Sequence, residues 1–145
     1  MKSYKVFIMV AVITLIGGMS VGASAKVKCV PKIYAFGFAA SFNDSTVHFT
    51  DIQEIDSAWI NEKNKFLIGR DNYSYQLKNY FASIGMPHRT CIISFALNRN
   101  DIEKKYKKMK EKYEKAGNFI IKNLDGKDFH FTAIKPDDFD LSTNK

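Results

Sequence analysis

The stretch KIYAFGFAASF, residues 32–42, decides the fold because it is apolar on both faces of an extended strand. Alternate positions on one face carry the aromatic residues Tyr34, Phe36, Phe38 and Phe42. The opposite face carries mostly small residues, namely Ile33, Ala35, Gly37, Ala39 and Ser41. A strand without a polar face is typically buried on both sides. We therefore predict a central strand here, with a helix packed closely against the small face.

A second strand is expected at residues 46–55, directly after the turn-forming residues Asn43, Asp44 and Ser45. Val47 and Phe49 share one face of this strand, and His48 lies on the opposite, polar face. The alternation shifts near Ile52, which indicates a β-bulge that changes the phase of the strand. The two strands should form a hairpin.

The first helix is predicted to follow a loop or short helical turn at residues 57–70, which should place Trp59 against the core. Asp71 can cap this helix, and Gly85 followed by Pro87 should end it. Its apolar positions have helical spacing. They are Tyr73, Leu77, Tyr80, Phe81 and Ile84.

The remaining elements are a strand, a helix and a final hairpin. Residues 90–97 read as a strand, and Asn100 with Glu103 forms a capping box for a lysine-rich helix that ends at Gly117. Segments 118–124 and 128–134 are expected to be strands joined by the Asp-Gly turn of LDGK.

This order predicts an α+β domain with a two-layer mixed sheet of about five strands, ordered ββαβαββ, and two main helices. Residues 26–134 have the length of one domain, and residues 135–145 are expected to be an acidic flexible tail.

Residues 1–25 have the pattern of a secretory signal peptide, with basic Lys2 and Lys5, an uncharged apolar run and a small-residue ending at Ala25. Cleavage after Ala25 would make the protein secreted or periplasmic and leave no stable membrane span. The alternative is an uncleaved N-terminal membrane anchor. Cleavage lowers the formal net charge from +7 to +5. That excess on an exported chain does not predict a nucleic-acid partner.

The two cysteines, Cys29 and Cys91, could form a disulfide in an oxidising compartment. Cys91 also follows His88 and Arg89, the ingredients of an activated thiol. However, Cys91 shares its strand face with apolar residues, so we predict a structural cysteine.

The sequence predicts no metal site and no cofactor, because its three histidines lack helical ligand spacing and it has no phosphate-binding or dinucleotide motif. An alternative is a small hydrolase-like enzyme. It would use His48 and His130, which could meet across the sheet, or the carboxylates of Asp51 and Glu54.

The strongest binding signal lies at the start of the first helix, where Arg70, Asn72 and Tyr75 fall close together and Tyr75 lies off the apolar stripe. Tyrosine and arginine are enriched in binding hot spots. The sequence thus favours a non-catalytic binding module for a protein, a peptide or a cell-surface component. A further possibility is a subunit that completes its sheet with a partner's strand, which requires an uncovered sheet edge.

Overall fold

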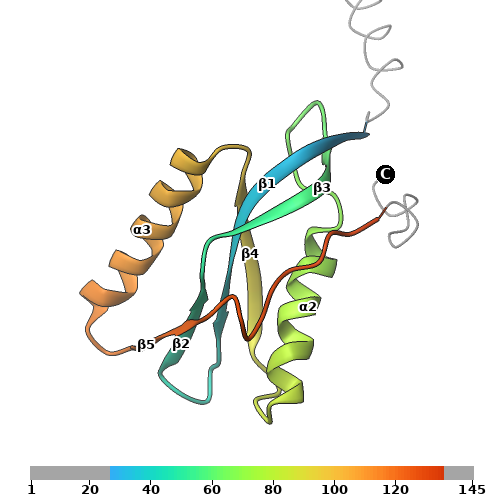
Figure 1. Ribbon diagram of the computed structural model, residues 1–145. Helices are drawn as coiled ribbons and strands as arrows, with labels where there is room; N and C mark the ends of the chain where they lie inside the picture. The colour runs from blue at the N-terminus through green and yellow to red at the C-terminus, as the bar shows by residue number, and fades with distance from the viewer. Residues whose placement is uncertain (1–26, 136–145) are drawn as a thin grey trace, which may run out of the picture.

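The structure, a computed structural model, describes residues 27–135 (Figure 1). The expected signal peptide and most of the expected tail, residues 136–145, lie outside the described residues.

The described part of the chain contains one five-stranded sheet and two long helices. The strands are β1 Val27–Ala40, β2 Thr46–Thr50, β3 Gln53–Asn61, β4 Thr90–Ala96 and β5 Ile120–Leu124. The helices are α2 Arg70–Ser83 and α3 Arg99–Ala116. The predicted α+β class with a mixed sheet is confirmed.

Strand β1 is the centre of the sheet. It pairs with β4 on one side and with β2 and β3 on the other, all antiparallel, while β5 is parallel to β2. Ala35 lies opposite Gln53 and Phe38 lies opposite Phe49. Two residues of β1, 36–37, therefore lie opposite three residues of the neighbouring segment, 50–52. The one extra residue between β2 and β3 is the predicted bulge.

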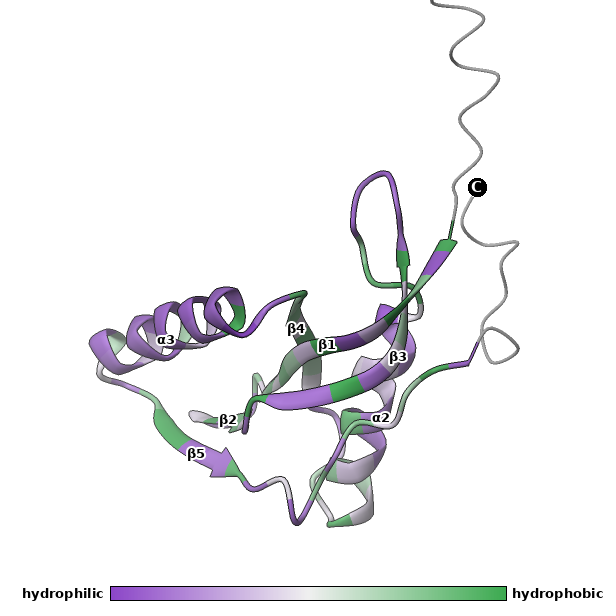
Figure 2. Cartoon of the chain, turned by 45° about the horizontal axis from the view of Figure 1, so that its top comes forward, coloured by the Kyte–Doolittle hydropathy of each residue, from purple (hydrophilic) through white to green (hydrophobic). Residues whose placement is uncertain are grey.

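The two helices cover opposite faces of the sheet (Figure 1), so the layering is fuller than the two layers expected from the sequence. The small face of β1 packs under α2, in a core that includes Ala35, Ala39, Tyr73, Leu77 and Phe81. The aromatic face packs under α3, in a core that includes Phe36, Phe38, Phe49 and Ile102. Most of α3 is otherwise hydrophilic (Figure 2), which suits a helix with one solvent-facing side.

Gly37 is where α2 comes closest to the sheet. A Cβ atom at this position would lie 2.7 Å from Leu77 Cδ2, 3.0 Å from Phe131 Cζ and 3.2 Å from Thr50 Cγ2. The Gly37 N–H donates to Thr50 Oγ1 at 2.8 Å across the bulge. The predicted close contact between a helix and the small face is confirmed.

The helix starts differ from the predicted ones. The N-cap of α2 is Gly69, with φ +73°. Asp71 lies in the first turn, where its negative charge interacts favourably with the positive end of the helix dipole. The N-cap of α3 is Asn98, whose side chain accepts a hydrogen bond from the Asp101 N–H at 2.9 Å. Asn98 and Asn100 each precede an acidic residue by three positions, so the capping-box pattern could not tell which of the two is the N-cap.

Residues 57–61 continue β3, which corrects the predicted loop. Ala58 and Ile60 fill the core on the α2 side, and Trp59 pairs with Cys29 of β1. The prediction failed because the polar residues after Asn61 obscured the end of the strand.

The predicted strand at residues 128–134 is absent from the described structure, and so is its hairpin. The segment instead runs along α2 (Figure 1) because Phe129, Phe131 and Ile134 fill the core between α2 and the sheet. Side chains bind its main chain. Gln53 accepts from Phe131 N–H at 2.8 Å and donates to Phe129 C=O at 2.9 Å, and Gln76 makes the same two bonds to Thr132, both at 2.9 Å.

Substituting Gly37→Ala should lower the free energy of unfolding by about 1–3 kcal/mol, because the added methyl group overpacks the contact with Leu77 and Phe131. Urea unfolding measures the change. Gly126→Ala is the matched control, since its Cβ would meet nothing closer than Asp51 Oδ2 at 3.9 Å. Equal stability of the two variants would contradict the close contact.

Substituting Gln53→Leu should lower the free energy of unfolding by about 2 kcal/mol or more. The reason is that it leaves two buried main-chain groups, the Phe129 C=O and the Phe131 N–H, without hydrogen-bond partners. Gln76→Leu is the comparison: its two bonds are exposed, so water replaces them at smaller cost. Chemical denaturation of both variants gives the two values. A larger loss for Gln76→Leu would show that the buried amide of Gln53 does not hold the segment.

Candidate functional site

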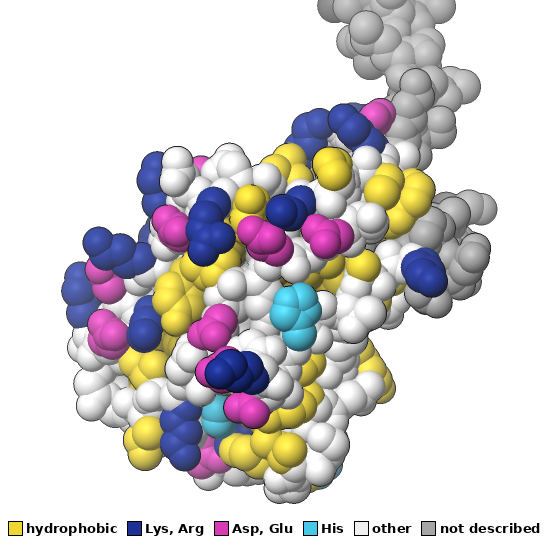
Figure 3. Space-filling view, in the orientation of Figure 1, with side chains coloured by type: hydrophobic (Ala, Val, Ile, Leu, Met, Phe, Trp, Pro, Cys, Tyr) yellow, Lys and Arg dark blue, Asp and Glu magenta, His cyan; other side chains and the backbone are white. Residues whose placement is uncertain are grey.

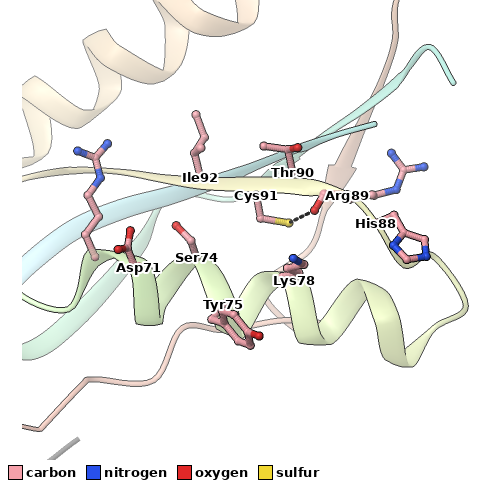
Figure 4. Close-up of a pocket in the computed structure, with 10 residues that line it drawn as sticks. Asp71, Ser74, Tyr75, Lys78, His88, Arg89, Thr90, Cys91 and Ile92 are labelled. Atoms are coloured by element: carbon pink, nitrogen blue, oxygen red, sulfur yellow. Dashed lines mark hydrogen bonds between the residues drawn. The ribbon is translucent and has the colours of Figure 1, made fainter. Parts of the chain in front are cut away.

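Two of the three predicted binding residues, Arg70 and Tyr75, line an open groove between α2 and β4 (Figure 4). The groove has a volume of about 590 Å³. The helix side is formed by Asp71, Ser74, Tyr75 and Lys78, which share one helical stripe. Asn72 is not part of the lining.

Tyr75 is held at the rim of this groove, with 60% of its surface exposed. The ammonium group of Lys78 lies 5.9 Å from the centre of the Tyr75 ring. Arg70 is anchored to β4, where its guanidinium donates to the Ile93 carbonyl at 3.0 Å. Tyr75 is therefore the available aromatic contact of the groove.

A second groove of about 610 Å³ follows the other half of β4, and the sequence did not predict it. The exposed side chains of Phe66 and Leu97 line it together with Lys104 and Lys105. Arg70 lines both grooves, one of which follows residues 90–92 and the other residues 94–97, and we call the two grooves together the β4 trough. The sequence offered one sign of this groove: Phe66 and Leu97 are apolar residues that lie outside both predicted helices.

The β4 trough runs along a free edge of the sheet. Within residues 27–135, β4 pairs with β1 and with no other strand. Gly37 of β1 lies opposite Ile93 but directs its N–H away from β4, to Thr50. Because ladder bonds alternate along an antiparallel pair, Cys91, Ile93 and Phe95 direct their main-chain groups toward the free edge.

Cys91 forms part of the groove wall, with its sulfur turned to the Arg89 carbonyl at 3.8 Å (Figure 4). Burial raises the pKa of the Cys91 thiol to about 11, although Lys78 and Arg89 act in the opposite direction. A thiol with this pKa is protonated at neutral pH and is a poor nucleophile. Its packing against the α2-side core fits the structural role predicted from the strand pattern.

The possible disulfide between Cys29 and Cys91 is not formed, and both cysteines are free. Cys91 lies opposite Ala39, and Cys29 precedes Ala39 by ten residues of β1. An extended strand rises about 3.3 Å per residue, so the two cysteines are separated by roughly 30 Å. A disulfide requires Cα atoms within about 7 Å.

His48 does not lie on a solvated face as expected, because α2 covers that side of β2. The side chain is 9% exposed, and its ring centre lies 4.9 Å from that of Phe81. Arg89, 5% exposed, is paired with Asp44 at 2.8 Å and donates to the Thr46 carbonyl at 3.2 Å. Burial first, and then the charge of Arg89, lower the pKa of His48.

The other residues of the hydrolase-like alternative take part in local contacts. His130 Nδ1 lies 2.8 Å from the carbonyl of Phe131, in a segment that is not a strand, so the sheet does not bring it to His48. Asp51 accepts hydrogen bonds from the Asn123 side chain at 2.7 Å and from the Gly126 N–H at 3.1 Å.

Glu54 does not form a pair with Asp51. It forms an ion pair with Lys32 at 3.1 Å. Among the described residues, no group of three or more histidine, cysteine or acidic side chains could hold a metal ion.

Across residues 27–135, no helix has the length and apolar character needed to cross a membrane. Comparison with protein-family models, curated proteins and solved structures finds no match to this chain.

The buried His48 should make stability depend on pH in a defined window. The pKa of His48 is lower in the folded than in the unfolded protein. Its contribution to the free energy of unfolding is therefore complete above about pH 6.5 and is lost as the pH falls through the pKa of the folded protein. The slope should not exceed about 1.4 kcal/mol per pH unit for one proton.

Urea unfolding between pH 7.5 and pH 5 measures this slope. The variant His48→Gln should flatten it. A slope that survives in His48→Gln would assign the pH dependence to another group.

Proposed function

We propose that this protein is a non-catalytic binding module, secreted or periplasmic after cleavage at Ala25, that holds another polypeptide in the β4 trough. The observation that carries the proposal is the exposed Tyr75 beside the free edge of β4. An aromatic ring beside a strand edge offers a partner both apolar contact and main-chain hydrogen bonds.

The anchoring of the trough supports a preformed site. Tyr75 projects from a helix whose neighbouring residues Tyr73 and Leu77 are fully buried, so its backbone position is fixed. Rigid anchors reduce the entropy that a partner's binding must overcome.

The hydrolase-like alternative has less support. Its groups lie in separate local contacts: His48 against Phe81, Asp51 with Asn123 and Glu54 with Lys32. A hydrolytic site needs an acid and a base that converge on one pocket.

The proposal predicts that Tyr75→Ala lowers the recovery of envelope proteins crosslinked to the purified chain. Truncating a hot-spot aromatic costs about 1.4 kcal/mol or more, which is a tenfold loss of affinity. The matched control is Phe42→Ala, which removes a fully exposed aromatic from the β1–β2 turn, outside the trough.

Quantitative mass spectrometry of the crosslinked products compares the parent with both variants. Proteins that belong to the site should be lost with Tyr75→Ala and kept with Phe42→Ala. Equal recovery by all three proteins would rule out the proposed surface.

A further inference from the structure

We infer that the β4 trough binds an acidic segment of another protein in extended form, as a strand added to the free edge of β4. The inference rests on the proposed function and specifies how the partner binds and what its chemistry is. Three features of the trough support it: its main-chain groups, its apolar side chains and its charge.

The main-chain groups at the edge are suited to an added strand. Cys91, Ile93 and Phe95 point their N–H and C=O groups outward, as the direction of the Gly37 N–H establishes. Two of the outward carbonyls are already bonded to cations: Arg70 donates to Ile93 at 3.0 Å, and Lys105 donates to Phe95 at 2.9 Å. These bonds confirm that the carbonyls face outward, and an added strand would replace both with its own N–H groups.

Apolar side chains lie on both sides of this edge. Tyr75 lies on the α2 side, 60% exposed, and Ile92 points to the opposite face of the sheet, 41% exposed (Figure 4). Phe66 and Leu97, 63% and 43% exposed, continue the apolar surface past the end of β4. Successive side chains of an added strand point to alternate faces, so both sides of the edge can contact apolar residues of the partner.

The charge of the trough selects an acidic partner. Its exposed cations are Lys65, Arg70, Lys78, Lys104 and Lys105, whereas Arg89 is buried and already paired with Asp44. Asp71 and Asp101 are the acidic residues of the same lining. The exposed charge of the trough is therefore positive, in contrast to the face in Figure 3, where acidic and basic side chains are interspersed.

The same charge disfavours a second copy of this chain. Pairing β4 of one copy with β4 of another would bring two basic troughs together, and like charges at close range oppose association. A partner with carboxylates flanking its strand would instead be attracted, and its acidic groups would meet the lysine and arginine side chains displaced from the edge.

The test uses a seven-residue peptide of alternating glutamate and valine, with blocked ends, and the full chain. Amide hydrogen exchange followed by NMR reports each main-chain N–H. With peptide at about ten times its Kd, exchange should slow about tenfold at Cys91, Ile93 and Phe95. Exchange at Ile92 and Ser94 should not change, because their N–H groups already bond to β1. This alternation is specific to strand addition.

Two control peptides separate the contributions. The same sequence with an N-methylated main chain keeps its side chains but has no N–H groups, and it should not protect the edge. A lysine–valine peptide keeps its main chain and reverses its charge, and it should bind at least about tenfold more weakly at low salt.

The charge of the trough is tested on the protein itself. Lys78→Gln combined with Lys104→Gln should weaken binding of the glutamate peptide severalfold. Lys107→Gln with Lys108→Gln, which removes two charges from outside the trough, should leave the affinity unchanged. Equal effects of the two pairs would overturn the assignment of the acidic partner to this site.

The outcomes distinguish this inference from the proposed function. Peptide-induced NMR shifts at Tyr75 without alternating protection would keep the binding site and overturn strand addition. No effect of millimolar peptide anywhere on the trough would also overturn strand addition, while the Tyr75→Ala crosslinking experiment decides the proposed function. Alternating protection that appears with protein concentration alone would identify a second copy as the partner and overturn the acidic segment.

Discussion

The close approach of α2 to β1 at Gly37 is the contact on which the rest of the fold depends. With no Cβ at this position, Leu77, Phe131 and Thr50 meet over the middle of the central strand. The approach also leaves the Gly37 N–H free to bond to Thr50 across the bulge. That bond sets which groups of β1 serve β2 and which serve β4, and through the pairing it turns Ile93 outward.

Because both faces of the sheet are covered, several polar side chains that could serve a site instead hold segments of the fold together. Gln53 and Gln76 bind the main chain of the last described segment, and Arg89 is buried against Asp44 and the hairpin. The buried side chains of Gln53 and Arg89 each satisfy main-chain groups that would otherwise be left without a hydrogen bond. The same covering leaves the sheet edge at β4 as a place where a polar main chain meets exposed apolar residues.

That edge shows two of the features by which proteins limit uncontrolled strand pairing. Arg70 and Lys105 place cations on outward carbonyls, and further lysines surround the edge. Positive charge opposes pairing with another copy and favours an acidic partner, so protection and selectivity arise from the same residues. This edge differs from one whose charges serve only to prevent strand pairing, because it also carries the exposed side chains of Tyr75, Ile92 and Phe66.

The sequence by itself determined the central strand, the bulge near Ile52, the helix ends at Gly85 and Gly117, and the core-facing position of Cys91, because each depends on neighbours within a few residues. Tertiary structure alone decided that residues 128–134 pack along α2 and that His48 is buried, because both depend on how much apolar surface α2 must cover. It also decided that Cys29 and Cys91 lie far apart along β1 and that Arg70, Tyr75 and the edge of β4 share one trough. Those are distances between segments remote in the chain, and no local pattern of residues encodes them.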